Sequence, residues 1–142
     1  MQLGCVEMMD REIRIIVAGG RDFDDYTMLR STIHNLLFAL IDQYDDLEKS
    51  NIRFISGSAR GADSLGEKYA NNYGYNLSRF PADWDNLGKS AGYIRNKQMA
   101  EFAIDDNSIG ILLAFWDGKS KGTKHMIDLA KKNNLEVIII EI

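Results

Sequence analysis

The chain has 142 residues, of which 45% are hydrophobic and 27% are charged, and its formal net charge is −4. This balance is typical of one globular domain that is long enough to bury an ordinary core. The acidic charge disfavours a general nucleic-acid binder, because phosphate backbones require clustered lysine and arginine. No apolar run approaches the roughly 20 residues of a membrane span, and no secretory signal pattern is visible. The single cysteine, Cys5, cannot form an internal disulfide, so we expect a protein of the reducing cytoplasm that does not enter a membrane.

Short apolar runs rich in β-branched residues alternate with segments of helical periodicity along most of the chain. A peripheral N-terminal extension is expected at residues 1–12. The expected elements then follow as strand 13–18, helix 25–44, strand 52–56, helix 61–73, strand 75–80, helix 90–104, strand 109–116, helix 122–133 and strand 135–142. Such alternation predicts right-handed crossovers and a parallel sheet. We therefore expect a single α/β, Rossmann-like domain over residues 13–142, with a mostly parallel five-stranded sheet and helices on both faces.

Three glycine-bearing turns each follow an expected strand and precede an expected helix. They read Val17-Ala-Gly-Gly-Arg-Asp-Phe23, Ile55-Ser-Gly-Ser-Ala-Arg-Gly-Ala-Asp63 and Phe115-Trp-Asp-Gly-Lys-Ser-Lys-Gly-Thr123. Glycine lets backbone N–H groups approach a ligand closely, and the N-terminus of a helix favours negative charge. Ligands of open α/β sheets lie outside the carboxyl ends of the strands, which is where all three turns fall. The pattern predicts a site for a phosphorylated ligand at this edge.

In the first turn, Gly19 and Gly20 precede Arg21, whose planar guanidinium suits a phosphate or carboxylate. The alternative is an ordinary turn, in which the glycines relieve the backbone and Asp22 or Asp24 caps the next helix. The turn matches neither the G-x-G-x-x-G fingerprint nor the Walker A motif, which disfavours a conventional dinucleotide or triphosphate site. We include Asp22 with the candidate ligand-binding residues.

The second and third turns supply most of the expected phosphate contacts. The second contributes Gly57, Ser58, Arg60 and Gly61, and the third contributes Gly118, Ser120, Gly122 and Thr123. Asp63 either caps its helix or accepts hydrogen bonds from ribose hydroxyls. Trp116 ends a strand, and Trp84 lies in a polar loop after the third expected strand. Either tryptophan is a candidate for stacking on a base, although Trp116 also fits an ordinary core position.

Five motifs in this order resemble the YspA-type branch of the SLOG superfamily, which also holds the Lonely Guy phosphoribohydrolases and the DNA-processing proteins of the Smf/DprA kind. Besides the first and third turns, they are Ser56-Gly-Ser-Ala-Arg-Gly-Ala-Asp63, Phe80-Pro-Ala-Asp-Trp84 and Ala91-Gly-Tyr-Ile-Arg-Asn-Lys-Gln-Met99. The resemblance extends over residues 13–142. It implies a Rossmann-like domain that binds nucleotides or nucleotide-derived molecules, of a type frequent in bacteria and their phages.

The resemblance carries over the catalytic residues only in part. Lonely Guy enzymes use an arginine in a helical R-K-x-x-M-like segment, which Arg95 resembles, and a glutamate in a P-G-G-x-G-T-x-x-E loop. Gly122-Thr123 resembles that loop, but Met126 occupies the glutamate position. Methionine cannot stabilise an oxocarbenium ion, which requires a nearby carboxylate. Arg95 and Asp117 are our candidate catalytic residues, and Asp22, Asp63 and Asp83 stay open as substitutes for the missing carboxylate.

The leading hypothesis is binding, as sensor or sequestering protein, of a nucleotide or nucleotide-derived molecule of the ADP-ribose type. The alternatives are a nucleotide-processing hydrolase, of the N-glycosidic, phosphoribohydrolase-like kind or acting on phosphate bonds, and a DprA-like DNA-processing accessory protein. We expect a nucleotide-derived small molecule as the partner rather than nucleic acid, and a homodimer or higher homo-oligomer stays open. His34 and His125 do not pair with cysteines or acids at metal-ligand spacing, so we expect neither a metal nor a cofactor.

Overall fold

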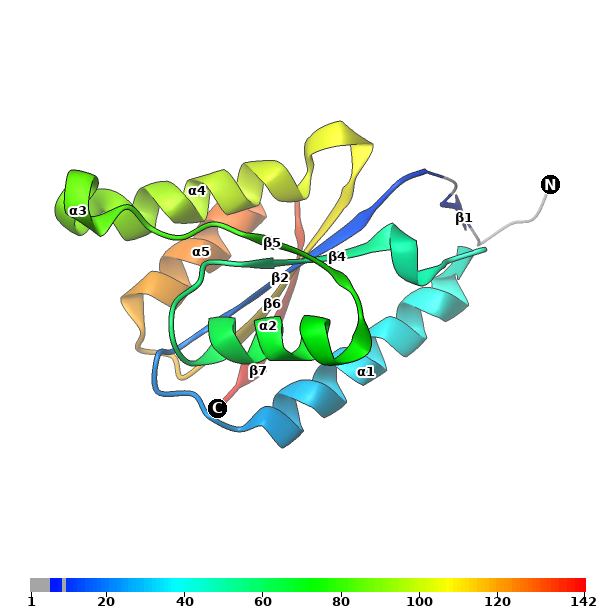
Figure 1. Ribbon diagram of the computed structural model, residues 1–142, viewed down its shortest axis with the longest axis horizontal. Helices are drawn as coiled ribbons and strands as arrows, with labels where there is room; N and C mark the ends of the chain where they lie inside the picture. Colours follow the sequence, from blue (N-terminus) through cyan, green and yellow to red (C-terminus); the bar gives the residue numbers. More distant parts are fainter. Residues whose placement is uncertain (1–5, 9) are drawn as a thin grey trace.

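The computed structural model describes residues 6–8 and 10–142, and its centre is a five-stranded sheet (Figure 1). In spatial order the strands are β5 (Asn76–Arg79), β4 (Ile52–Ser56), β2 (Ile13–Gly19), β6 (Ile109–Trp116) and β7 (Glu136–Glu141). Every pairing in this sheet is parallel. The chain builds outward from β2 to β5 on one side and then returns to add β6 and β7 on the other. This order confirms the predicted α/β, Rossmann-like fold and places the reversal of strand order beside β2.

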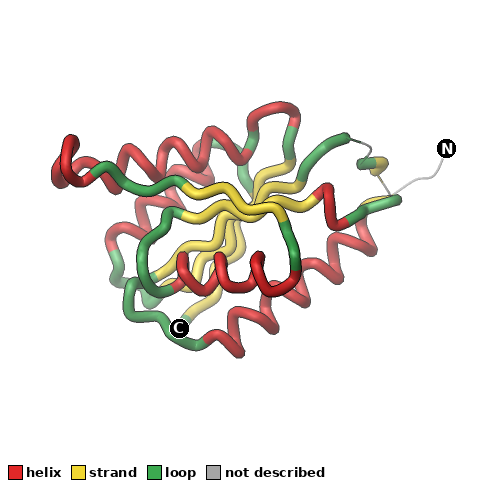
Figure 2. The backbone as a smooth tube through the Cα atoms, viewed as in Figure 1, coloured by secondary structure: helices red, strands yellow, loops and turns green. Residues whose placement is uncertain are grey.

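Helices cover both faces of the sheet (Figure 2). The α-helices are α1 (Tyr26–Gln43), α2 (Ala62–Tyr73), α3 (Trp84–Leu87), α4 (Ala91–Ala103) and α5 (Lys121–Lys132), and 3₁₀ turns lie at Lys49–Asn51, Gly88–Ser90 and Asp105–Asn107. Helices α1 and α2 pack on one face, and α4 and α5 pack on the other. Among the helices of the described residues, none is both long and apolar enough to cross a membrane.

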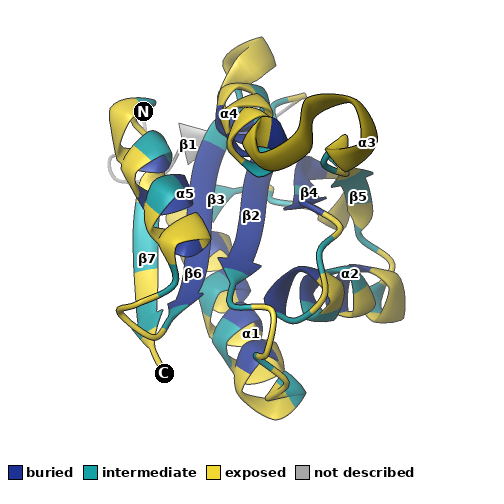
Figure 3. Cartoon of the chain, turned by 90° about the vertical axis from the view of Figure 1, so that its left-hand side faces the viewer, coloured by how far each residue is buried: buried dark blue, intermediate teal, exposed yellow. Residues whose placement is uncertain are grey.

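The alternation of side chains along β2 divides the core into two layers. Ile15 and Val17 belong to the cluster that α1 and α2 cover, whereas Ile16 belongs to the cluster that α4 and α5 cover. Figure 3 shows β2 and β6 buried along nearly their whole length. Each fully buried side chain of this size contributes about 1.5–3 kcal/mol relative to an exposed one. Along α1 the buried apolar residues end at Leu40. The next apolar residue of the expected helix, Ile41, is 61% exposed and does not pack in the core.

The segment before β2 contacts the domain at several points. Strand β1 (Val6–Glu7) pairs in parallel with β3 (Tyr44–Asp45), and Met8 is buried in the core. Glu12 accepts hydrogen bonds from Arg14 at 2.9 Å and from Arg53 at 3.2 Å. Residues 1–5, which include Cys5, and residue 9 lie outside the described residues. The division of the chain at residue 12 therefore stays a prediction.

Candidate functional site

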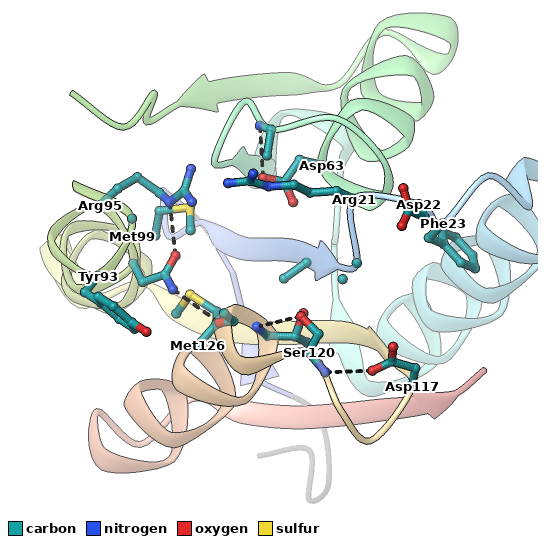
Figure 4. Close-up of a pocket in the computed structure, with 18 of the residues that line it drawn as sticks. Arg21, Asp22, Phe23, Asp63, Tyr93, Arg95, Met99, Asp117, Ser120 and Met126 are labelled. Atoms are coloured by element: carbon teal, nitrogen blue, oxygen red, sulfur yellow. Dashed lines mark hydrogen bonds between the residues drawn. The ribbon is translucent and has the colours of Figure 1, made fainter. Parts of the chain in front are cut away.

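A cleft of about 710 Å³ opens at the carboxyl edge of the sheet, where the loops after β2, β4 and β6 meet the first turns of α4 and α5. Its volume falls within the usual range for small-molecule sites, and its place beside β2 is where the strand order reverses. Eleven of the predicted site residues line it: Gly19, Gly20, Arg21, Asp22, Asp63, Trp84, Arg95, Asp117, Ser120, Gly122 and Thr123. The structure thus brings all three glycine-bearing turns and the arginine of α4 to one place (Figure 4).

The first turn owes its shape to close backbone packing. A Cβ at Gly19 would lie 2.6 Å from the carbonyl oxygen of Phe115 and 2.8 Å from Cβ of Ala62, so only glycine lets β2 end between β6 and α2. Asp25 caps α1, accepting a hydrogen bond from the Met28 N–H at 3.0 Å. The cap is therefore not Asp22 or Asp24, and both of these carboxylates line the cleft.

The glycine at the end of the second turn packs the first two turns together. Gly61 has a φ of +81°, and a Cβ on it would overlap the carbonyl oxygen of Gly20. The N–H of Ala62 donates to that same oxygen at 3.3 Å. Ser58 turns away from the cleft, because its hydroxyl lies 3.3 Å from the Glu67 carboxylate. These contacts give Gly61 and Ser58 a structural role in fixing the turn.

Asp63 is the deepest charged group of the cleft. It does not cap α2, whose cap residue Gly61 offers no side chain; instead its Oδ2 accepts a hydrogen bond from the Ala59 N–H at 3.2 Å. Its Oδ1 has no hydrogen-bond partner among the described residues, although the side chain is only 8% exposed. Burial raises the pKa of Asp63 to about 6, against the opposing effects of the Ala59 hydrogen bond and the Arg95 charge. A carboxyl group with this pKa exchanges protons near neutral pH.

Arg95 reaches the same point from α4. Its Nε donates to Oδ1 of Asn96 at 3.0 Å and its Nη1 donates to the carbonyl oxygen of Gly57. A Cβ at Gly57 would lie 2.6 Å from Nη1 of Arg95 and 2.8 Å from Oδ2 of Asp63, so this glycine keeps the space between the two groups open. Burial and the neighbouring charge of Arg21 lower the pKa of Arg95, and Asp63 raises it. Figure 4 shows Arg21 and Arg95 pointing toward one another across the cleft beside Asp63.

Asn96 is a site residue that the predicted set omits. Its buried amide donates to the carbonyl oxygen of Gly122 at 3.4 Å and lies 3.2 Å from Nδ1 of His125, while its carbonyl accepts from Arg95. One side chain therefore ties α4 to the start of α5. The signal in the sequence is its position directly after Arg95 in the helical motif.

The third turn presents the N-terminus of α5 to the cleft. Oδ1 of Asp117 accepts hydrogen bonds at 2.8 Å from the N–H groups of both Lys119 and Ser120, and these bonds lower the pKa of the exposed Asp117 carboxylate. Ser120 then caps the helix, and Nε1 of Trp116 donates to the carbonyl oxygen of Ser120 at 3.1 Å. The following N–H groups, of residues 121 and 122, have no hydrogen-bond partner among the described residues. The turn is thus braced by its own side chains and leaves backbone donors free.

Aromatic and apolar side chains also line the cleft, close to its cations: a Cβ at Gly92 would lie 3.3 Å from the Trp84 ring and 3.8 Å from Nη2 of Arg95. The Arg21 guanidinium lies 5.7 Å from the ring centre of Trp84, which is 48% exposed. Tyr93 makes an edge contact with His125 at a centroid distance of 4.5 Å. Tyr93 and two buried methionines, Met99 and Met126, also line the cleft but are not in the predicted set, because glycine motifs mark only the candidate anion contacts.

Six predicted residues do not line the cleft: Gly57, Ser58, Arg60, Gly61, Trp116 and Gly118. Arg60 is exposed and lies 3.8 Å from Asp22 at the rim. The ligand contacts of all these residues, the ribose contact of Asp63 and the catalytic roles of Arg95 and Asp117 stay predictions. Within residues 6–8 and 10–142, no group of three or more His, Cys, Asp and Glu side chains is arranged to hold a metal ion.

Comparison with known proteins gives two matches. The family described as YspA, cpYpsA-related SLOG matches residues 13–86, from the start of β2 into α3. A protein named Gene 61 protein, from Mycobacterium phage D29, is 32% identical over 132 residues, which cover 88% of this chain and 94% of the phage protein. No solved structure gives a significant match. The family match and the similarity over almost the whole chain show that the protein belongs to the YspA, cpYpsA-related SLOG family.

Proposed function

We propose that the cleft binds a nucleotide-derived ligand of the ADP-ribose type. Membership of the SLOG family supports a nucleotide-related function in general terms. The observation that carries the finer proposal is that free cationic and backbone donors line the same cleft as an exposed aromatic ring. That combination suits the two parts of a nucleotide, a charged phosphate and a flat base.

The phosphate half of the proposal rests on donors that the fold leaves without partners. The Arg21 guanidinium makes no hydrogen bond to another described residue, and its one described contact is the face of Trp84. Nη2 of Arg95 is likewise free of hydrogen bonds within the described chain. With the open N-terminus of α5, these groups offer charge-assisted hydrogen bonds to a phosphate from two directions.

The base half rests on the exposed ring of Trp84 and on Tyr93. An indole ring that is 48% exposed at the mouth of a cleft loses little by stacking on a base and gains apolar contact. The buried Met99 and Met126, which also line the cleft, add adaptable apolar surface. A base bound there would replace the present contact between Arg21 and the Trp84 ring, which would free the arginine for the phosphate.

The test is ligand-induced thermal stabilisation with ADP-ribose and ADP, with adenosine as the phosphate-free comparison. At a ligand concentration 100-fold above Kd, binding to the folded state adds about 2.7 kcal/mol of stability. We expect ADP-ribose and ADP to raise the Tm of the wild type, and adenosine to raise it much less. Arg21→Ala and Gly57→Val should abolish the response, because one removes a phosphate donor and the other displaces Arg95 and Asp63.

Arg30→Ala, which removes an exposed arginine of α1 that does not line the cleft, is the matched control and should respond like the wild type. Equal responses of Arg21→Ala, Gly57→Val and the wild type would show that the ligand binds elsewhere. The absence of any response to either phosphorylated probe would contradict the proposed function.

A further inference from the structure

The inner end of the cleft holds one buried carboxyl group between two cations. Asp63 is 8% exposed, its Oδ1 is without a partner among the described residues, and no ion pair within 4.0 Å joins it to Arg95 or Arg21. The other carboxylates of the cleft lining are exposed: Asp22, Asp24 and Asp117. No buried side-chain atom of the described residues lacks a hydrogen-bond partner, so the free Oδ1 is open to the cleft that Asp63 lines. A buried carboxyl group with one oxygen open to a cleft is typical of functional sites.

The two arginines determine which sign of charge is stabilised at this end of the cleft. Arg21 lowers the pKa of Arg95, which shows that the two guanidiniums are close enough to repel each other. An anion bound between them relieves that repulsion and receives hydrogen bonds from their free N–H groups. A reaction that accumulates positive charge, such as the departure of a base from a ribose, is opposed by the same two cations. A reaction that accumulates negative charge on a phosphoryl group is favoured.

We propose that the cleft hydrolyses a P–O bond of its bound nucleotide, with Asp63 as the group that exchanges a proton with the leaving oxygen and with Arg21 and Arg95 holding the phosphoryl group. This inference rests on the proposed function. In the step, the oxygen of a water molecule forms a bond to phosphorus while the bond from phosphorus to the leaving oxygen breaks. The Asp63 carboxyl proton passes to the leaving oxygen, and a proton of the attacking water returns to the carboxylate. For ADP the sum is ADP³⁻ + H₂O → AMP²⁻ + HPO₄²⁻ + H⁺. For ADP-ribose it is ADP-ribose²⁻ + H₂O → AMP²⁻ + ribose 5-phosphate²⁻ + 2 H⁺. In both cases the released protons pass to the solvent and Asp63 is unchanged.

The environment of Asp63 suits a proton donor. Its pKa is already near 6 in the free protein because it is buried; the Glu67 charge adds to this rise, and the Ala59 hydrogen bond and the charges of Arg95 and Arg21 oppose it. A phosphate bound beside Asp63 raises that pKa further by like-charge repulsion. The protonated form is then present at neutral pH in the complex, where a general acid is needed. The short turn from Gly57 to Ala59 fixes the carboxyl group through the Ala59 hydrogen bond, so the free oxygen stays directed to the ligand side.

The experiment incubates the protein with ADP and with ADP-ribose in the presence of EDTA and follows the products by ³¹P NMR and by chromatography of the free base. We expect new phosphate monoester or orthophosphate signals and no free adenine. Asp63→Asn should lower the rate by about 100-fold or more, in line with the contribution of a general acid. It should keep the thermal stabilisation by the same probe, because asparagine preserves the shape of the side chain. Asp42→Asn, an exposed acid on α1, is the matched control and should keep the wild-type rate.

The pH profile separates proton transfer from a merely structural role. The wild-type rate should fall as the pH rises through the pKa of Asp63 in the complex. The residual rate of Asp63→Asn should not show this decrease. Probes that bind but stay intact would overturn the inference and leave the proposed function standing. Release of adenine, an unchanged rate in Asp63→Asn, or turnover that appears only when EDTA is left out would also overturn it. Failure of every probe to bind would remove both proposals together.

Discussion

Replacing Asp63 with asparagine should stabilise the protein at neutral pH, although the residue lies in the cleft. The carboxyl group has an ordinary pKa of 3.8 and a pKa of about 6 in the folded chain, because burial penalises its charged form. Between these values the folded state binds more protons than the unfolded state, so stability falls as the pH rises through this window. A pKa difference of 1 between the folded and unfolded states corresponds to about 1.4 kcal/mol in the free energy of unfolding. The full penalty, reached above pH 6, is therefore about 3 kcal/mol.

Asp63→Asn removes this penalty and keeps an oxygen that accepts the Ala59 hydrogen bond. We expect the variant to gain up to about 3 kcal/mol in the free energy of unfolding at pH 7.5, or about 10 °C in Tm. At pH 4.0 the gain should shrink to about 0.5 kcal/mol, because this pH lies only just above the unfolded-state pKa of 3.8 and little of the penalty is then present. Urea unfolding followed by circular dichroism at the two pH values measures both numbers, and Asp42→Asn should stay within about 0.5 kcal/mol of the wild type. A variant that is less stable at pH 7.5, or whose gain is the same at both pH values, would refute this account of Asp63.

Two further predictions concern residues that hold the cleft together. Gly61→Ala should lower the free energy of unfolding by at least about 2 kcal/mol, because the position has a φ of +81° and a Cβ there overlaps the Gly20 backbone. Gly122→Ala should be tolerated or should stabilise the protein by up to about 1 kcal/mol, since no atom lies within 4 Å of the added Cβ in this first turn of α5. If denaturant unfolding gave the same loss of stability for both variants, the packing role of Gly61 would be contradicted. Asn96→Ala should lower the free energy of unfolding by about 2–3 kcal/mol and weaken ADP-ribose binding in calorimetry. The substitution removes the acceptor of the Arg95 Nε hydrogen bond and the donor to the Gly122 carbonyl oxygen. The exposed Asn35→Ala on α1 should change neither quantity, and an equally mild Asn96→Ala would show that this side chain does not organise the site.

The architecture could be predicted from local patterns because the sheet is buried on both faces. The apolar runs of β4 and β6 have the predicted limits, residues 52–56 and 109–116, since glycine, serine and polar residues bound them. Elements of two to four residues, such as β1, β3 and α3, were missed because they are too short to show a period. The parallel pairing of β1 with β3 depends on contacts that no local pattern reveals.

The position of the cleft could be predicted from the sequence, but the packing role of each residue around it could not. Glycine turns at strand ends mark the carboxyl edge, and the arginines Arg21 and Arg95 indeed line the cleft there. Nothing in the second turn itself distinguishes Gly57, which leaves room for Arg95, from Gly61, which leaves room for the first turn. That distinction arises only when α4 and β2 are packed against the turn. The free oxygen of Asp63 is likewise a property of the fold, since the sequence also allows Asp63 to cap its helix.

An NMR titration of the ¹⁵N-labelled protein with ADP-ribose tests the central claim, that the cleft binds a nucleotide-derived ligand, most directly. The account predicts saturable amide shifts that cluster in residues 19–22, 57–63 and 117–123 and in the first turn of α4. Those segments surround the free donors of Arg21, Arg95 and the α5 N-terminus. Shifts that cluster elsewhere, for example on the exposed face of α1, or no shifts at millimolar ligand, would contradict it.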